Sequence, residues 1–239
     1  MPSAARRYTR RFGQNIYKPD SSCVLYLEGQ TDYPSATIKD LSGYGNHGTI
    51  TGATWVTLPS GLKVLSFDNT DDVINCGHNT SLNITTNLTI LCWINLIGGN
   101  SYSDIVSKAS AYTVDGFEYY QEFQTTTTYR ERFRTDGGGD AQITSTDIDN
   151  LAGRYVFACV TKEGANALIY HDGVSVHLNT TGNHSNITGN DAQDLRVGKA
   201  SINNAPLNGS IGGVRILNVA LSATEIANIY NSERHIYGV

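Results

Sequence analysis

Hydrophobic residues along the chain fall into short runs, separated by clusters of Gly, Asn, Asp and Ser. CVLYLEG (residues 23–29) is the first run, and NLTILCWINL (residues 87–96) has the character of a central strand. Runs of this kind between turn-forming residues are typical of β-strands, and their regular recurrence is typical of a β-sandwich. We therefore predict an all-β fold. Further predicted strands lie in GLKVLSFDNTDDVINC (61–76), DIVSKA (104–109), GFEYYQEF (116–123), YRERFR (129–134), RYVFACVTK (154–162) and ALIYHDGVSVHL (167–178).

The end of the chain changes to a helical period. Within ALSATEIANIY, Ser222 is placed to cap a helix N-terminus, and Glu225 follows at the spacing of a capping box. The apolar residues that then share one helical face are Ile226, Ile229 and Tyr230. We predict a short C-terminal helix that packs this face on the sandwich.

Length and charge suggest one domain with a basic arm. The chain has 239 residues, 39% of them hydrophobic, which is enough for one substantial core. The net charge is −5, yet residues 1–20 are basic. The charged residues of this segment are Arg6, Arg7, Arg10, Arg11, Lys18 and Asp20. We predict an arm over residues 1–20 and one domain over residues 21–239. The arm is either a disordered solubilising terminus or a contact for nucleic acid, an acidic neighbouring subunit or an anionic surface.

The four cysteines are widely spaced and form no CxxC pair, so the sequence does not indicate a zinc site. Cys23, Cys92 and Cys159 lie in apolar runs, where cysteine behaves as a small hydrophobic residue. We predict reduced cysteines in the core.

Membrane insertion and conventional export lack support in the sequence. No apolar run approaches the roughly 18 residues of a membrane span. The arginines near the start are not followed by the apolar stretch of a signal peptide. The location that we favour for this protein is a virion or extracellular surface. The protein would reach that surface without a recognisable signal peptide.

Five segments, in order, resemble the concanavalin A-like lectin/glucanase superfamily and its laminin-G-like jelly rolls. They are KDLSGYGNHGTITGATW (39–55), LSFDNTDDVINCG (65–77), SLNITTNLTILCWI (81–94), LIYHDG (168–173) and LNGSIGGVRILNVALSATEIANIY (207–230). The resemblance covers about residues 22–231. It implies a jelly-roll sandwich of two antiparallel sheets, each with six or seven strands. This architecture hosts lectins, adhesion modules, glycanases and virion surface proteins, so function must be argued from sites.

The glycine-rich loop allows two interpretations. A turn of this kind can direct backbone carbonyls toward Ca²⁺, with Asp40 and Asn46 adding side-chain oxygens. Related laminin-G-like domains commonly carry two acids in a later segment, where this chain has Gly212 and Gly213. Since one carboxylate neutralises a divalent ion poorly, we favour a structural turn with no required cofactor. In that interpretation Asp40 and Asn46 bind local amides, and Trp55 anchors the following strand.

The sequence does not favour an enzyme. Related glycanases present Glu-x-Asp-x-Glu on one strand, but here Tyr120 takes the place of the middle acid between Glu118 and Glu122. Four residues along a strand separate two carboxylates by about 13 Å, beyond the roughly 5 Å and 6.5 to 9.5 Å of retaining and inverting hydrolases. No GxSxG or HExxH motif is present.

One predicted hairpin carries a charged face. If the loop between GFEYYQEF and YRERFR closes symmetrically, Tyr119 faces Phe133 on an aromatic, core-like side. The opposite side then carries three cross-strand pairs, Glu118–Arg134, Tyr120–Arg132 and Glu122–Arg130. This face is either a solvated surface or a ligand site, in which Tyr120 offers a ring to a sugar and the arginines donate hydrogen bonds.

Three functional hypotheses follow. The leading one is a non-enzymatic recognition or adhesion module that binds glycan or a surface partner. The second is a structural or decorating subunit of a virion or extracellular filament, which self-assembles or attaches through the basic arm. The third is a divergent glycoside hydrolase.

Overall fold

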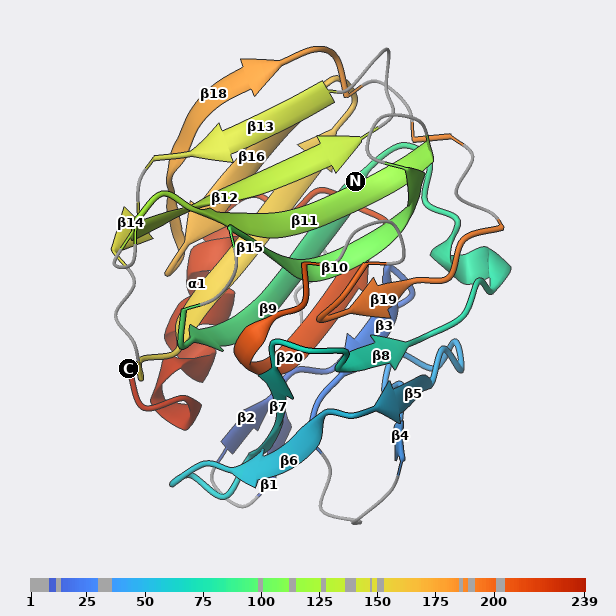
Figure 1. The fold of residues 1–239 in the computed structure, drawn as a ribbon. Coiled ribbons are helices and arrows are strands. Elements are labelled where there is room, and N and C mark those ends of the chain that lie inside the picture. The colour runs from blue at the N-terminus through green and yellow to red at the C-terminus, as the bar shows by residue number, and fades with distance from the viewer. Residues whose placement is uncertain are drawn as a thin grey trace.

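The computed structural model is a jelly roll in which two antiparallel sheets pack face to face (Figure 1). Among the residues that the structure describes, one sheet has ten strands and the other has eight. The described residues are 9–11, 14–29, 36–98, 101–111, 115–125, 128–135, 141–146, 148–149, 153–184, 187–188, 192–200 and 205–239.

The ten-stranded sheet forms the front layer in Figure 1. Its strands, in spatial order, are β18 (His177–Thr181), β13 (Ala141–Ser145), β12 (Thr128–Thr135), β11 (Asp115–Phe123), β10 (Tyr102–Ala111), β19 (Arg196–Val197), β8 (Val73–Asn75), β5 (Gly48–Thr51) and β4 (Thr37–Ile38), with β14 (Ile148–Asp149) beside β12. Four strands that are adjacent in sequence, β10 to β13, therefore lie side by side.

The eight-stranded sheet lies behind it. Its strands are β17 (Val174–Ser175), β16 (Asn166–His171), β15 (Val156–Glu163), β9 (Leu88–Leu96), β20 (Asn208–Leu217), β7 (Lys63–Asp68) and β6 (Thr54–Thr57), with β3 (Cys23–Leu27) beside β20. The resemblance implied six or seven strands in each sheet, and this number is wrong because short peripheral strands such as β4, β14 and β17 extend both sheets. The remaining elements are the β1–β2 pair (Thr9–Arg11 and Gln14–Ile16), the 3-10 turns η1 (Thr80–Leu82) and η2 (Arg234–Ile236), and α1 (Ala223–Glu233).

The main core fills the space between the sheets. Strand β12 alternates between half-buried and buried residues along its whole length, so one of its faces enters the core and the other does not. Tyr119 and Phe133 from the ten-stranded sheet join Ile90 and Val160 from the eight-stranded sheet in one hydrophobic cluster. Trp55, on the edge strand β6, packs against this cluster but is only half-buried. All four cysteines are buried and none of them forms a disulfide bond, as predicted.

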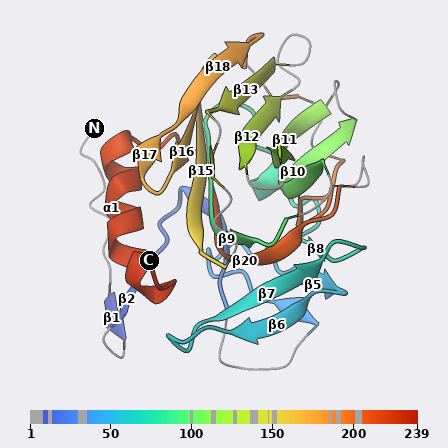
Figure 2. The ribbon, with the colours of Figure 1, turned by 60° about the vertical axis from the view of Figure 1, so that its left-hand side comes forward.

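The C-terminal helix begins as predicted. The Ser222 side chain accepts a hydrogen bond from the Glu225 backbone amide, and the Glu225 carboxylate accepts one from the Ser222 amide. Figure 2 shows α1 on the side of the eight-stranded sheet that faces away from the ten-stranded sheet. Ile226 and Ile229 are buried there in a second hydrophobic cluster with Trp93. The helix therefore lies on the outer face of the eight-stranded sheet. It does not cover the outer face of the ten-stranded sheet (Figure 2).

A residue of the predicted arm belongs to the core. Tyr17 is only 2% exposed and packs edge-on against Tyr26, with 5.5 Å between ring centroids. The Arg215 guanidinium lies against both rings, 4.4 Å from the centroid of Tyr17 and 4.6 Å from that of Tyr26. Arg215 also forms a 2.7 Å ion pair with Glu233, the last residue of α1. The end of the arm thus covers a buried charge that ties α1 to β20, while residues 1–8 lie outside the described residues.

Candidate functional site

The hairpin of β11 and β12 has the register predicted from the sequence. Glu118 pairs with Arg134, Tyr120 with Arg132, and Glu122 with Arg130. Phe123 pairs with Tyr129 and Tyr119 with Phe133 on the opposite face. The loop closes with the Gln124 amide hydrogen-bonded to the Thr128 carbonyl oxygen, at 3.0 Å. The symmetric closure assumed from the sequence is therefore confirmed.

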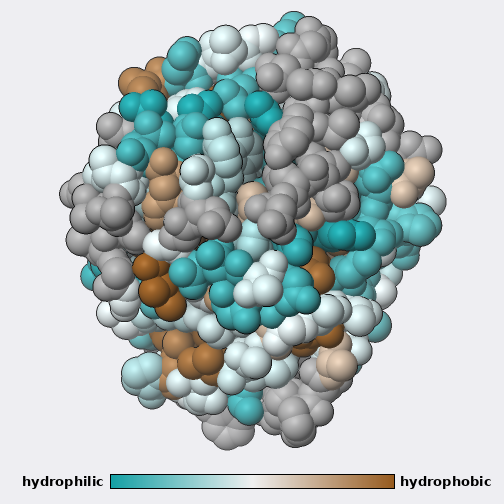
Figure 3. All heavy atoms as spheres, viewed as in Figure 1, coloured by the Kyte–Doolittle hydropathy of each residue, from teal (hydrophilic) through white to brown (hydrophobic). Residues whose placement is uncertain are grey.

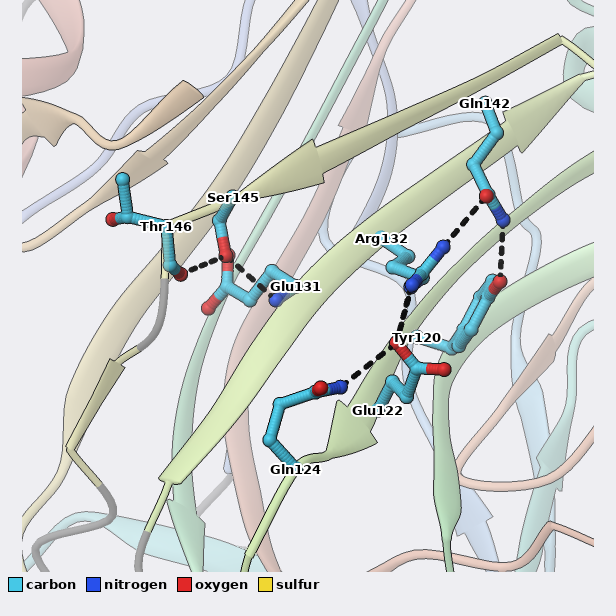
Figure 4. Close-up of polar contacts among 8 residues, drawn as sticks. All are labelled: Tyr120, Glu122, Gln124, Glu131, Arg132, Gln142, Ser145 and Thr146. Atoms are coloured by element: carbon cyan, nitrogen blue, oxygen red, sulfur yellow. Dashed lines mark hydrogen bonds and ion pairs between the residues drawn. The ribbon is translucent and has the colours of Figure 1, made fainter. Parts of the chain in front are cut away.

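Alternation separates a core face from an outer face. Tyr119 and Phe133 are fully buried between the sheets, whereas Arg132 retains 20% of its side-chain exposure. Figure 4 shows Tyr120, Glu122 and Arg132 gathered with Gln142. The space-filling view of this side of the molecule shows mainly hydrophilic and intermediate side chains among the described residues (Figure 3). The outer face of the ten-stranded sheet is thus polar but partly enclosed.

A hollow of about 320 Å³ lies on this outer face. Its lining residues are Tyr102, Glu118, Tyr120, Glu122, Arg132, Arg134 and Gln142. They come from β10, β11, β12 and β13. The structure therefore brings together five of the six residues that the sequence suggested as a ligand site. Arg130 is the exception, because it lies near the beginning of β12 and does not line the hollow.

Arg132 is held from two sides. Its Nε donates to Glu122 Oε2 at 2.6 Å, and its Nη2 lies 2.5 Å from the same oxygen. Its Nη1 donates to Gln142 Oε1 at 2.6 Å. Charge-assisted hydrogen bonds of this kind are strong and directional. The Arg132 guanidinium, which lines the hollow, is therefore held in place with most of its donors in use.

Tyr120 is the aromatic centre of the hollow. Its ring is 5% exposed, and its hydroxyl accepts a 2.8 Å hydrogen bond from Gln142 Nε2. Burial raises the pKa of the Tyr120 phenol above its ordinary value, although the charges of Arg134 and Arg132 lower it in part. The hydroxyl therefore keeps its proton at neutral pH. Because its oxygen accepts from Gln142 Nε2, the hydroxyl can donate this proton only to a different group.

Two residues of the hollow were not identified from the sequence. Tyr102 is 45% exposed, and its ring meets that of Tyr120 edge-on at 6.0 Å between centroids. Gln142 lies on β13, which pairs with β12 so that Gln142 is opposite Arg134. Tyr102 stands two residues before Asp104, the first residue of the predicted strand DIVSKA, so an earlier start for that strand would have suggested it. No comparable signal marks Gln142, because its strand was not among those predicted.

The glycine-rich loop is anchored by Asp40. Asp40 Oδ1 accepts from the backbone amides of Tyr26 and Ser42, both at 2.9 Å. Asp40 Oδ2 accepts from the Asn46 amide at 2.9 Å and from the Ser42 hydroxyl at 2.6 Å. Asn46 donates its side-chain amide to the Val24 carbonyl oxygen at 2.7 Å. Both carboxylate oxygens of Asp40 therefore accept hydrogen bonds from local donors.

A second acidic group lies in the turn between β7 and β8. The carboxylate oxygens of Asp68, Asp71 and Asp72 lie within 4.8 Å of one another. Asp72 accepts a 2.8 Å hydrogen bond from the Asp68 amide, and Asp68 accepts one from the Thr70 amide at 3.0 Å. These bonds fix the turn by which the chain passes from one sheet to the other.

The two glutamates of the hollow do not form a hydrolytic pair of the usual kind. Glu118 and Glu122 occupy the same face of β11, and the residue midway between them is Tyr120. Four strand residues correspond to a separation of about 13 Å, too long for either hydrolase geometry. In addition, the Glu122 carboxylate is already engaged by Arg132. The two carboxylates therefore have the spacing of neither hydrolase class.

Comparison with known proteins extends these observations. The family model of the concanavalin A-like lectin/glucanases superfamily matches residues 68–227. No curated protein matches the sequence. Among the described residues, no helix is long and apolar enough to cross a membrane.

Several solved structures share the fold. The binding domain of Paraclostridial Mosquitocidal Protein 1 is 17% identical with a TM-score of 0.70, and the match covers 91% of this chain and 55% of that one. The binding domain of Botulinum Neurotoxin DC in complex with SialylT is 15% identical with a TM-score of 0.61, over 89% and 52% of the two chains. The Botulinum Neurotoxin serotype G binding domain is 15% identical with a TM-score of 0.63, over 87% and 50%. The chain thus spans about half the length of these solved structures, and the likeness concerns the fold.

Proposed function

The chain belongs to the concanavalin A-like lectin/glucanases superfamily, and on that basis we propose that it is a non-enzymatic recognition module that binds glycan in the hollow on β10 to β13. The observation that carries the proposal is the hollow itself. It combines two aromatic rings, Tyr102 and Tyr120, with charged and amide side chains fixed by hydrogen bonds. A few oriented polar groups beside aromatic rings are the usual composition of a small-molecule site.

The fixed geometry supports recognition. Arg132, Gln142 and Tyr120 form a chain of hydrogen bonds across three strands, so their polar atoms are oriented before any ligand arrives (Figure 4). Preorganisation of this kind lowers the entropic cost of binding. Strands also hold side chains more rigidly than loops do.

The solved structures of similar fold support the same class of function. Those named above are binding domains, and one was solved with SialylT. This chain corresponds to about half of each of these structures.

Binding to a glycan array, with and without a chelator, tests the proposal. The matched variants are Tyr120→Phe, which removes only the hydroxyl in the hollow, and Tyr44→Phe, which removes an exposed hydroxyl in the glycine-rich loop. We expect the wild type and Tyr44→Phe to bind the same defined glycans on the array. We expect Tyr120→Phe to bind those glycans more weakly. Failure of every glycan to bind, or equal binding by both variants, would contradict a site at this hydroxyl.

A second candidate function is a structural or decorating subunit of a virion or extracellular filament. The uneven charge supports it, since residues 1–20 are basic although the whole chain carries a net charge of −5. Such an arm suits attachment to an acidic partner or nucleic acid. Concentration-dependent assembly in analytical ultracentrifugation, lost at high salt or on removal of residues 1–16, would favour this candidate.

A further inference from the structure

We propose that the hollow selects uncharged sugar residues over sugars that carry a carboxylate or sulfate. This inference rests on the proposed glycan binding and specifies its ligand class. It follows from the charge balance of the hollow, from the engagement of Arg132, and from the polar atoms that are left for a ligand.

The charged groups of the hollow balance one another. Glu118 and Glu122 contribute two carboxylates, and Arg132 and Arg134 contribute two guanidinium groups. The hollow has no net formal charge, so it offers no long-range attraction to an anion. An acidic sugar would also bring its charge close to two carboxylates in a partly enclosed space, where like charges repel more strongly than in water.

Arg132 is not arranged to receive an anion. Arginine binds a carboxylate best through two parallel N–H groups, such as those on its Nε and Nη2. Both of these nitrogens already bind Glu122 Oε2, at 2.6 and 2.5 Å, and Nη1 binds Gln142. A sugar carboxylate would have to displace Glu122 and leave that carboxylate without its cation. Arg134, the second cation, lies over the Tyr120 ring at 5.8 Å from its centroid.

The remaining polar atoms match hydroxyl groups. Arg132 and the side-chain amide of Gln124 both bind Glu122 Oε2, so Oε1 is the carboxylate oxygen left to accept from a ligand. The Tyr120 hydroxyl has a proton to donate, and Gln142 has a second amide hydrogen. A sugar hydroxyl both donates and accepts, so it can satisfy an acceptor and a donor at once. The hollow is therefore complementary to neighbouring hydroxyls on one uncharged ring.

Tyr102 supplies an apolar surface beside these groups. Its ring is 45% exposed and packs against Tyr120 at an interplanar angle of 62°. An exposed aromatic face can pack against the C–H face of a pyranose ring. The volume of about 320 Å³ lies at the lower end of the range for ligand pockets, which suits a small saccharide.

The experiment compares paired oligosaccharides, one member neutral and the other carrying an added acidic residue or group. Lactose and sialyllactose form one pair, and other neutral oligosaccharides are paired with their sulfated or uronic-acid forms. Dissociation constants are measured by calorimetry and by ligand-observed NMR at low salt. We expect the neutral member of a recognised pair to bind at least about tenfold more tightly.

A charge variant tests the cause of the preference. Glu122→Gln leaves the hollow with one net positive charge and weakens the binding of Arg132 to residue 122. The ratio of the dissociation constants of the acidic and neutral members should therefore fall by at least about threefold, or the order of affinities should reverse. Glu163→Gln makes the same chemical change at an exposed position outside the hollow and should leave the preference unchanged.

The outcomes separate this inference from the proposed function. If acidic members bind as tightly as neutral ones, and binding still depends on Tyr102 and Tyr120, the selectivity is overturned while glycan binding stands. If no member binds, or if binding is the same in Tyr102→Ala and Tyr120→Phe as in the wild type, both are overturned. A neutral preference that Glu122→Gln leaves unchanged would contradict the electrostatic origin proposed here.

Discussion

Glu122 lies directly opposite Arg130 in the register of β11 and β12, but its carboxylate binds Arg132, two residues further along β12, at 2.5 Å. Diagonal neighbours of this kind are within reach of long side chains in a twisted antiparallel pair. The diagonal ion pair draws Arg132 toward Glu122 and lets Gln142 reach both Arg132 and the Tyr120 hydroxyl. The ion pair between Glu122 and Arg132 thus sets the positions of the polar groups in the hollow.

Tyr102→Ala is expected to weaken glycan binding by about fivefold, because it removes the exposed ring beside Tyr120 and contacts of about 1 kcal/mol. The folded state should change little, since the ring is 45% exposed. Calorimetry and the melting temperature check the two parts. Tyr44→Ala is the matched control, because Tyr44 is 40% exposed and lies outside the hollow. Equal weakening by both variants would contradict a specific role for Tyr102.

The stability of the fold should depend on the protonation of Glu131. This residue is fully buried, and burial raises the pKa of its carboxyl from 4.5 to about 8; the Asp172 charge also raises it, and the hydrogen bond from Tyr119 lowers it. The folded state therefore retains a proton that the unfolded state loses above about pH 4.5. The contribution of this proton to the free energy of unfolding is therefore fully present below about pH 4.5. As pH rises from there toward about 8, the free energy of unfolding falls by up to about 1.4 kcal/mol per pH unit.

Glu131→Gln should remove this dependence while keeping an acceptor for the Tyr119 hydroxyl. Urea unfolding at several pH values between 4.5 and 9 measures the difference between variant and wild type. We expect that difference to grow in favour of the variant as pH rises. Glu163→Gln, at an exposed position, serves as the control. Parallel pH profiles of Glu131→Gln and wild type would show that Glu131 is ionised in the fold.

Asp40→Asn is expected to lower the free energy of unfolding by about 2 kcal/mol or more, because a buried carboxylate that accepts three backbone amides would be lost. A chelator should leave the melting temperature of the wild type unchanged. Thermal unfolding with and without EDTA and added Ca²⁺ checks this. A fall of tens of degrees that Ca²⁺ reverses would instead identify Asp40 and Asn46 as cation ligands.

Two truncations test where the domain begins. The strand pattern that begins at Cys23 predicts that the sandwich folds without residues 1–18. The structure adds that this deletion removes Tyr17, which is 2% exposed and covers Arg215, whereas removal of residues 1–16 spares it. We expect both proteins to fold, with the shorter less stable by about 2 to 4 kcal/mol. Identical denaturant midpoints would place Tyr17 outside the cooperative core.

The sequence by itself determined those features that depend on local periodicity. Alternation assigned Glu118, Tyr120 and Glu122 to one face, and the symmetric loop fixed their partners on β12, as the structure confirms. The spacing of Ser222 and Glu225 predicted the helix start for the same reason, since a capping box is complete within four residues.

Tertiary structure decided the rest of the hollow. Strand β10 changes register between Asp104 and Val106, so alternation counted along it loses phase and cannot assign Tyr102 to a face. Gln142 reaches Arg132 only because β13 lies beside β12.

The burial of Tyr17 also depends on the tertiary structure. Tyr17 is buried because β20 places Arg215 beside β3, and Tyr17 and Arg215 are almost 200 positions apart in a chain of 239. Side-chain periodicity is a property of one strand, whereas burial and ion pairing depend on which strands become neighbours.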